Sequence, residues 1–298
     1  MKDAFLGIDT SCYRTSAALF FNDGSYISNR KLLETKEGSL GLRQSEALFM
    51  HIRDLSDILR ELNLSQYNIK AVGVSEKPTE EEGSYMPVFL AGIMAAEAIS
   101  QSLGVPLYKF THQQGHIRAA LIENEEINPP FYAFHISGGT TECVHVDKNF
   151  SCKPILKTSD LKAGQAIDRL GVLLGLKFPA GAELDELSKK SHKTYKIKPS
   201  IKNGCPSFSG LQNKFENMLS SGESGEDTAK FVFTYITEAI KAMIKEIGEE
   251  NTFVFSGGVS ANSVLRDILG GKGRIFSKIE LSGDNAVGVA ALTFDNYE

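Results

Sequence analysis

The sequence predicts an α/β fold of two lobes that share one topology. A strand–turn–strand–turn–strand pattern occurs at residues 4–34 and again at 131–158, about 128 residues apart. Each copy is followed by helical segments, and each lobe later contains a buried strand, at 69–75 and at 252–258. Two lobes of one topology imply a cleft between them, with the turns of both copies at its floor.

The first copy reads as three short strands separated by polar turns. The apolar segments are "AFLGID" at 4–9, "SAALFF" at 16–21 and "YISNRKLLE" at 26–34, with turns "TSCYRT" and "NDGS" between them. A helix is expected at 42–62, with Leu48, Ile52, Leu55 and Leu59 on its apolar face.

The second copy repeats this order with different residues. Its strands are "FYAFHI" at 131–136, "TECVHV" at 141–146 and "SCKPILK" at 151–157, separated by "SGGT" and "DKNF". A helix near 227–248 leads into the buried strand at 252–258. We therefore expect the segments 4–34 and 131–158 to form equivalent antiparallel units.

Composition limits the classes of function. The chain has 298 residues, 42% of them hydrophobic and 23% charged, with a net charge of −5. This acidic balance argues against a free-standing nucleic-acid binder. Four cysteines without a C-x-x-C pair indicate reduced thiols, and no apolar run approaches membrane-spanning length, so we expect a cytoplasmic protein. The segment 76–85, "EKPTEEEGSY", is expected to be an exposed acidic loop.

Three turns rich in glycine or hydroxyl residues directly follow apolar strands. They are "DTSCYRT" at 9–15, "SGGTTE" at 137–142 and "SGGVSANSVLR" at 256–266. Such turns expose backbone N–H groups that bind phosphate. One such turn alone is more often a plain tight turn, but three in a duplicated α/β frame indicate a nucleotide site. None of them matches the P-loop or the G-x-G-x-x-G pattern.

His112 and His116 lie one helical turn apart, which would place both imidazoles on one face. In the metalloprotease pattern H-E-x-x-H the glutamate is the general base, but Gln113 stands at that position and cannot accept a proton. Asp284, in a turn before an apolar segment, is the best candidate for a third ligand. Two histidines at this spacing are also common as simple core or surface residues.

Taken together, these motifs resemble those of the transferases that make threonylcarbamoyladenosine in transfer RNA, formerly described as glycoproteases. Besides the two histidines, the matching segments are "LGIDTSC" at 6–12, "ISGGTT" at 136–141, "GQAIDRLGVLLGLKFPAGAELD" at 164–185, "PSFSGLQ" at 206–212, "GGVSANSVLR" at 257–266 and "DNAVGV" at 284–289. The resemblance implies a two-lobed actin-like or sugar-kinase-like fold, a duplicated RNase H-like architecture. We expect residues 1–110 plus 285–298 in the first lobe and 111–284 in the second.

The resemblance also implies roles for individual residues. His112, His116 and Asp284 would hold one divalent metal, iron or zinc, with His135 within reach as a further ligand or as a packing residue. The residues expected to contact an adenine nucleotide or acyl adenylate are Asp9, Ser137, Gly138, Gly139, Thr140, Thr141, Asp168, Gly181, Asp185, Gly257, Gly258 and Asn262. Asp168 and Asp185 have a plainer alternative as helix-surface or capping carboxylates.

The implied reaction is transfer of a threonylcarbamoyl group from its adenylate to the N6 amine of adenosine beside the anticodon. The implied partners are transfer RNA within a multi-subunit complex, a smaller inactive homologue of the same fold and an ATPase, with homodimers or heterodimers and no membrane contact. Two alternatives remain open. One is a non-catalytic paralogue that dimerises with a true transferase, and the other is a different nucleotide-dependent carbamoyl- or phosphotransferase.

The chain departs from the family pattern at four places. Tyr13 and Arg14 replace two acidic residues after "TSC", and the segment 76–92 replaces a glycine-rich loop. Ala180 stands for the first glycine of the "P-G-G" turn, and Gln165 for a glutamate. The metal and third-turn motifs are retained, which indicates a diverged member or paralogue.

Overall fold

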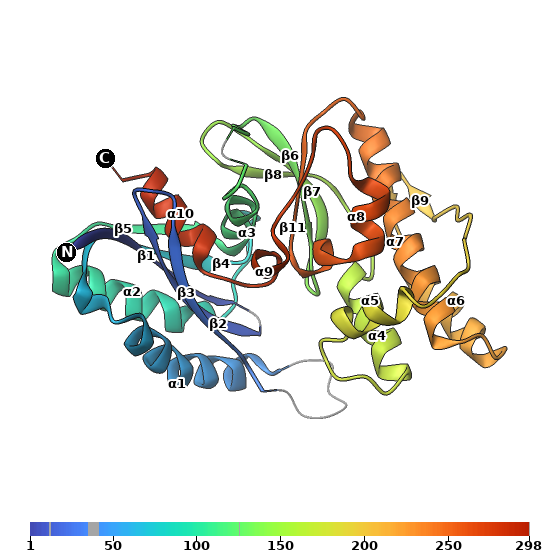
Figure 1. Ribbon diagram of the computed structural model, residues 1–298, viewed down its shortest axis with the longest axis horizontal. Helices are drawn as coiled ribbons and strands as arrows, with labels where there is room; N and C mark the ends of the chain where they lie inside the picture. The colour runs from blue at the N-terminus through green and yellow to red at the C-terminus, as the bar shows by residue number, and fades with distance from the viewer. Residues whose placement is uncertain (12, 35–41, 125, 298) are drawn as a thin grey trace.

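The computed structural model describes residues 1–11, 13–34, 42–124 and 126–297, and it shows two α/β lobes side by side (Figure 1). The first lobe holds a five-stranded sheet of order β3-β2-β1-β4-β5, and the second a five-stranded sheet of order β12-β11-β6-β7-β8. In each, three consecutive strands pair antiparallel and two further strands add in parallel on the other side. The predicted duplication is confirmed, as is the actin-like fold class that it implies.

The strands of the first sheet are β1 (Lys2–Ser11), β2 (Arg14–Phe21), β3 (Tyr26–Leu32), β4 (Tyr67–Lys77) and β5 (Leu107–Thr111). Those of the second are β6 (Phe131–Ile136), β7 (Thr141–Val146), β8 (Cys152–Lys157), β11 (Phe253–Ser256) and β12 (Arg274–Phe276). The predicted six-residue turn at 10–15 was too long, because β1 and β2 remain paired out to Ser11 and Arg14. Cys12, inside that turn, lies outside the described residues.

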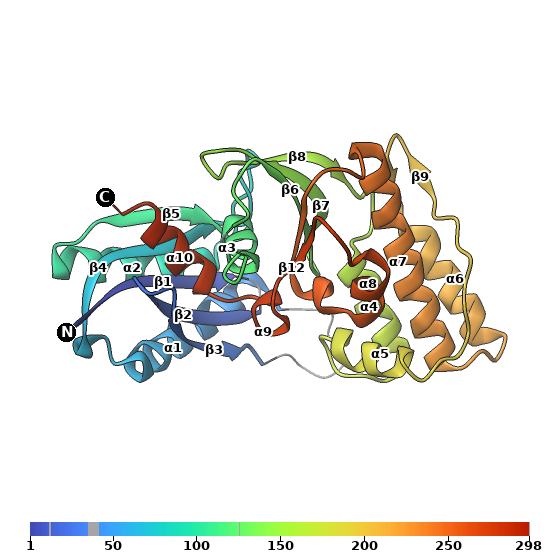
Figure 2. The ribbon, with the colours of Figure 1, turned by 45° about the horizontal axis from the view of Figure 1, so that its top comes forward.

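Helices flank both sheets, and the last one returns to the first lobe (Figures 1 and 2). They are α1 (Gln44–Leu62), α2 (Phe89–Leu103), α3 (His112–Ala120), α4 (Ala163–Leu173), α5 (Gly181–Ser188), α6 (Ser209–Ser220), α7 (Gly225–Ile247), α8 (Ser263–Leu269), α9 (Ile279–Ser282) and α10 (Val287–Asp295). Two 3₁₀ turns, η1 (Leu64–Gln66) and η2 (Gly258–Ala261), and a short hairpin, β9 (Ile201–Lys202) with β10 (Cys205–Pro206), complete the elements. Because α10 packs on β1, β2 and β4, the course of the chain agrees with lobes of 1–110 plus 285–298 and 111–284, boundaries that stay a prediction.

The apolar face predicted for α1 was partly wrong. Ile52 is 51% exposed, and the buried face instead includes His51, Asp54 and Ile58. His51 Nδ1 lies 2.9 Å from the Thr15 hydroxyl, and Asp54 accepts hydrogen bonds from Lys31 and Arg53. The buried face of α1 therefore includes polar residues that have hydrogen-bond partners, and apolar spacing alone did not predict that face.

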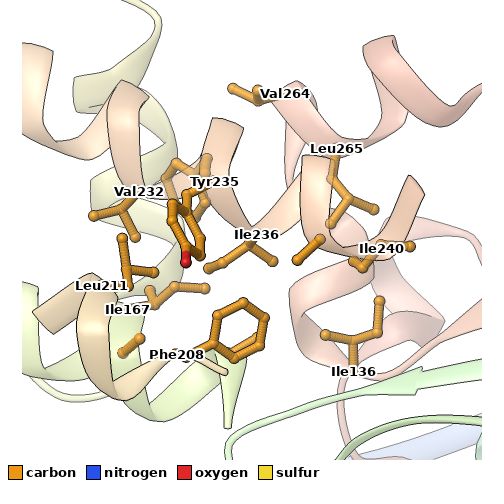
Figure 3. Close-up of a cluster of buried hydrophobic side chains, with 14 of the residues drawn as sticks. Ile136, Ile167, Phe208, Leu211, Val232, Tyr235, Ile236, Ile240, Val264 and Leu265 are labelled. Atoms are coloured by element: carbon orange, nitrogen blue, oxygen red, sulfur yellow. The ribbon is translucent and has the colours of Figure 1, made fainter. Parts of the chain in front are cut away.

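The core of the second lobe lies between its sheet and α4, α5, α6, α7 and α8 (Figure 3). The side chains labelled there include Phe208 and Leu211 from the α6 region, Tyr235 and Ile236 from α7, and Ile136 from the end of β6. The Tyr235 hydroxyl is not left unpaired, because it accepts a hydrogen bond from Ser200 N at 3.0 Å. Ile136 thus anchors the start of the 137–140 turn in the core.

The segment 76–85 is not simply an exposed acidic loop. Glu80 Oε2 accepts hydrogen bonds from Ser151 Oγ at 2.6 Å and from Cys152 N at 3.0 Å, and its Oε1 accepts one from Gln114 Nε2 at 3.0 Å. Of the four glutamates in this segment, Glu81, which pairs with Lys157, and Glu82 are exposed, and Glu76 and Glu80 are half-buried. Glu80 therefore ties the first lobe to the β7–β8 turn of the second, which charge counting did not predict.

Two remaining expectations concern thiols and membranes. Cys143 and Cys152 are buried free thiols and Cys205 is partly exposed, as expected for reduced cysteines. Across the described ranges, every helix is too short or too polar to cross a bilayer.

Candidate functional site

His112 is the first residue of α3, which starts directly after β5. Thr111 caps the helix, because its hydroxyl accepts a hydrogen bond from Gln114 N while the Gln114 side chain accepts one from Thr111 N. His116 follows one turn later, and the two imidazole centroids lie 4.4 Å apart. The predicted placement of both rings on one helix face is confirmed.

The close packing of α3 on α10 brings Asp284 to these histidines. A Cβ built on Gly288 would lie 1.8 Å from the carbonyl oxygen of Gly115, so only glycine permits this approach. Arg118 fastens the other end of α3 to Asp295 with hydrogen bonds of 2.6 and 3.2 Å. Asp284, just before α10, therefore reaches the histidines across 170 residues of sequence.

The three predicted ligands share a geometry suited to one metal ion. Asp284 Oδ1 lies 3.6 Å from His112 Nε2 and 3.4 Å from His116 Nε2. Two ligand atoms, each about 2.0–2.2 Å from a tetrahedral zinc, lie about 3.3–3.6 Å apart. One ligand atom from each of the three residues lies within 4.8 Å of the others, so a shared ion needs little rearrangement.

His135, on β6, faces the same place from the second lobe. Its ring centroid lies 4.9 Å from that of His116 and 6.2 Å from that of His112. Both ring nitrogens of His135 and Nδ1 of His116 are buried without a hydrogen-bond partner among the described residues, and His116 Nε2 has only the Asp284 carboxylate nearby, 3.4 Å away and without hydrogen-bond geometry. Buried polar atoms without partners cost stability unless a ligand satisfies them. We call His112, His116, His135 and Asp284 the histidine cluster, and its donor set fits a divalent metal.

Asp9 supports this cluster from β1. Its Oδ1 lies 3.1 Å from His112 Nδ1, and its Oδ2 accepts a hydrogen bond from the Ser11 hydroxyl at 2.7 Å. A carboxylate on the far nitrogen of a ligating histidine fixes the ring and raises its basicity. Asp9 thus contacts His112 in the structure, and its predicted contact with a nucleotide stays a prediction.

The two carboxylates of Asp9 and Asp284 favour a positive charge at the cluster, carried by a proton on His112 or by a metal ion. Burial alone would lower the pKa of His112, but the carboxylates of Asp9 and Asp284 raise it to about 10. Burial and the neighbouring His112 lower the pKa of His116, and burial lowers that of His135 further. Burial would raise the pKa of Asp284, but the two histidines hold it well below its usual range. In the metal-free protein His112 therefore holds a proton between two anionic carboxylates, whereas His116 and His135 stay neutral.

The second and third glycine turns meet next to this cluster. Gly257 has φ of 86°, and a Cβ there would lie 2.5 Å from Ile136 O and 2.9 Å from the His135 ring, so only glycine fits. In the 137–140 turn, Ser137 N donates to Thr140 O, and the Ser137 hydroxyl accepts from Thr140 N. The amide N–H groups of Gly138 and Gly139 have no partner within the described chain. They are available to an anionic oxygen.

Thr141 makes a structural contact, and its predicted contact with a nucleotide stays a prediction. Its buried hydroxyl accepts a hydrogen bond from Ala163 N at 2.9 Å, at the start of α4. Gly164 N donates to Ser137 O, which holds the same helix end against the turn. Gly258, by contrast, is exposed beside the third turn.

Asp168, Asp185 and Asn262, which we call the capping group, use their polar atoms within the protein. Asp185 Oδ1 accepts hydrogen bonds from Asn262 Nδ2 at 2.7 Å and from Ser263 Oγ at 2.8 Å, and it also faces Ser263 N. Asn262 Oδ1 caps α8 through Leu265 N. Asp168 Oδ1 accepts from Ala180 N at 2.9 Å, next to Gly181. The plainer capping alternative therefore describes their observed contacts, and their predicted contacts with a nucleoside stay predictions.

Two residues in or near the site were missed from the sequence. Glu142, buried on β7 opposite His135, accepts a hydrogen bond from Gln113 Nε2 at 2.5 Å. Gln113 is thus engaged by an acid rather than aimed at a substrate. His51, fully buried on α1, leaves its Nε2 without a partner in the described chain, and burial lowers its pKa to about 4. Its position on the buried face of a helix was the only available signal.

Comparisons with known proteins agree with this arrangement. The sequence model of the tRNA N6-adenosine threonylcarbamoyltransferase (TsaD) family matches residues 49–291. A protein of that name from Lactococcus lactis subsp. cremoris is 30% identical over 324 residues, covering 100% of this chain and 93% of its own length. One from Streptococcus pneumoniae is 31% identical over 309 residues, covering 96% of this chain and 90% of its own.

Solved structures support the fold at much lower identity. The Acidaminococcus fermentans (R)-2-hydroxyglutaryl-CoA dehydratase component A has a TM-score of 0.61 at 14% identity, with 98% of each chain covered. Full-length HypF, in a phosphate- and nucleotide-bound form, has a TM-score of 0.62 at 14% identity, covering 99% of this chain and 47% of HypF. These likenesses concern the fold alone.

Proposed function

Since the chain belongs to the tRNA N6-adenosine threonylcarbamoyltransferase family, we propose that it transfers a threonylcarbamoyl group from its adenylate to the N6 amine of adenosine beside the anticodon. It is a transferase of the acyl type and not a peptidase. The observation that carries the proposal is the histidine cluster, in which the buried ring nitrogens of His116 and His135 form no hydrogen bond within the described residues. A scaffold that had lost activity would have no physical need to keep them.

In this reaction, a C–N bond forms between the adenosine N6 and the carbamoyl carbon as the C–O bond to the phosphate breaks. AMP leaves, and the N6 proton passes to solvent or to a base. The amide N–H groups of Gly138 and Gly139 are positioned to stabilise negative charge on an anionic oxygen. Ser137, Thr140, Gly257 and Gly258 shape the same two turns.

His112, His116 and Asp284 would hold a divalent ion, iron or zinc, with His135 as a further ligand. When bound, such an ion supplies a Lewis acid and a template for anionic oxygens. Asp9 keeps the His112 ring oriented through its Nδ1 contact. Gln113 donates to Glu142 and is not a base, so the metalloprotease mechanism has no counterpart here.

Asp168, Gly181, Asp185 and Asn262 would shape the nucleoside side of the pocket. Their observed hydrogen bonds fix the ends of α5 and α8. This supports a positioning role, in which the capping group sets the shape of the third turn.

The net charge of −5 gives the chain a weak electrostatic grip on transfer RNA. We therefore propose that it acts in the cytoplasm with partner subunits, a smaller inactive homologue of the same fold and an ATPase. Phe49 and Ile52 on α1 and Met94 on α2 are exposed apolar side chains that such a homologue would cover.

The test is transfer of threonylcarbamoyl from its adenylate to unmodified transfer RNA, with and without partner proteins from the same organism. Product that requires His112, His116 and Asp284 supports the proposal. A stable complex with a second family member, but no product under any condition, would establish the scaffold alternative instead.

A further inference from the structure

We infer that Arg14 binds the phosphoryl group of a mononucleotide at the interlobe site, an inference that rests on the proposed function. Arg14 opens β2 on the face of the first sheet that also carries Asp9 and Arg30, since Asp9 pairs with Ser16 and Ser16 with Arg30. This face points toward α9 and α10, where Asp284 lies.

The Arg14 guanidinium lies directly against the residue before Asp284. A Cβ built on Gly283 would be 2.9 Å from Arg14 Nη1 and 3.6 Å from its Cζ. A side chain at position 283 would therefore displace the guanidinium from its place beside the histidine cluster. The Arg14 guanidinium therefore lies beside the residue that directly precedes Asp284, the predicted metal ligand.

Among the described residues, Arg14 has no ion-pair or hydrogen-bond partner that accounts for this position. In the part of the chain that the structure describes, no carboxylate lies within 4.0 Å of its guanidinium, and no side-chain hydrogen bond from it is formed. Arg30, its cationic neighbour, donates to the Glu280 carbonyl instead. Two guanidinium groups on one face, one of them free of acceptors, favour an anionic ligand.

The local charge count also favours an anion once a divalent ion is bound. Asp9, Asp284 and Glu280 contribute −3, the ion +2, and Arg14 with Arg30 +2, which leaves a net +1 around the site. The acidic pair found in the family at positions 13 and 14 would cancel this excess. The substitution therefore changes the preference of the site toward a more negative ligand.

A mononucleotide fits this position better than the backbone of a folded RNA. Arg14 is only partly exposed. Its neighbour Tyr13 contacts Phe178 of the second lobe, with ring centroids 5.1 Å apart. Segments of both lobes thus meet beside the guanidinium and limit access to small ligands.

The experiment measures binding of AMP and adenosine to the zinc-loaded full-length protein by calorimetry. We expect wild type to bind AMP at least about 10-fold more tightly than adenosine, because one charge-assisted hydrogen-bond pair is worth that much or more. Arg14→Ala should weaken AMP binding by about 10-fold and leave adenosine affinity unchanged, with the remaining preference for AMP supplied by the Gly138 and Gly139 amides and the ion. Arg14→Lys should retain part of the difference, since lysine keeps the charge without the planar fork.

Two controls separate this from general damage. Arg60→Ala removes an exposed arginine of α1 and should leave both affinities at wild-type values. Zinc affinity should stay equal or increase in Arg14→Ala, because a cation beside the ion has been removed. A variant that simply disrupts the site would lose zinc together with AMP.

Equal AMP affinity in wild type and Arg14→Ala would overturn the inference and leave the proposed function standing. Loss of binding to an anticodon stem-loop RNA, with AMP binding intact, would also overturn it in favour of an RNA phosphate. If wild type binds neither AMP nor adenosine at any zinc concentration, the proposed function fails as well.

Discussion

His116 and His135 bury ring nitrogens that find no partner within the described chain, whereas Asp185 and Asn262, across the site, share hydrogen bonds with each other and with α8. Both sets had been expected to bind ligands. The difference lies in what folding alone satisfies. The capping group is complete without a ligand, and the histidine cluster is not.

This contrast separates two ways in which a family motif is maintained. A buried histidine with unsatisfied nitrogens destabilises the folded state, and a bound ion offsets that loss of stability. A carboxylate that caps a helix contributes stability whether or not a nucleotide binds. Mutations in the histidine cluster should therefore abolish function with little loss of stability. Mutations in the capping group should lower stability.

The largest effect should come from the double variant His112→Ala/His116→Ala. We expect about one zinc or iron per wild-type chain and essentially none in the variant, because two of three ligands are removed. Transfer activity should fall by a factor of about 10³ or more. Metal analysis by mass spectrometry and the transfer assay measure both.

The matched control is His192→Ala, which removes an exposed histidine of the second lobe. It should keep the metal and the activity. Equal metal content in the double variant and wild type would show that the histidine cluster is a packing arrangement. The contrast between the histidine cluster and the capping group would then disappear.

The next effect concerns the capping group. Asp185→Ala should lower the free energy of unfolding by about 1–3 kcal/mol, because the buried Asn262 amide and the half-buried Ser263 donors lose a charged acceptor. Metal content should not change. Urea unfolding measures the loss, with Glu186→Ala, an exposed neighbour on α5, as the control. A stable Asp185→Ala protein with weakened AMP binding would instead place Asp185 among ligand contacts.

The sequence predicted the duplicated sheets because strand and turn patterns are local, and it placed His112 and His116 on one face because their spacing is local too. Asp284 was named as the third ligand from its place in a turn and from the resemblance, but the contact itself depends on Gly115 and Gly288 letting α3 and α10 approach. The role of Glu80 depends on hydrogen-bond donors more than 70 residues away, on Ser151 and Cys152. Periodicity carries no information about such partners.

A smaller effect is expected at His135. His135→Leu should weaken zinc binding by about 10-fold if the ring is a ligand, and it should stabilise the metal-free protein by about 1 kcal/mol, since two unpaired buried nitrogens are removed. Zinc titration and thermal unfolding of the metal-free protein give the two readouts. Unchanged zinc affinity together with higher stability would leave His135 as a packing residue.

The smallest effect concerns Asp168 and depends on pH. Burial raises the pKa of Asp168 to about 6, although the hydrogen bond from Ala180 N partly opposes this. The folded protein therefore holds the proton more tightly than the unfolded chain, whose carboxyl has a pKa near about 3.9. The resulting contribution to stability is present below about pH 4 and is lost as the pH rises to about 6.

Asp168→Asn keeps a carbonyl acceptor for Ala180 N but never carries the charge. At pH 8 the unfolding free energy of the variant should exceed that of wild type by about 1 kcal/mol. The full pKa shift of Asp168 would correspond to at most about 3 kcal/mol. The difference should shrink toward zero at pH 4, because the wild-type carboxyl is then neutral in both states. Urea unfolding of both proteins across this range measures the change. A variant that is less stable than wild type at pH 8 would show that the Asp168 anion is stabilised by a cation or donor. Asp168 would then resemble the histidine cluster, whose polar atoms depend on a ligand, rather than the capping group.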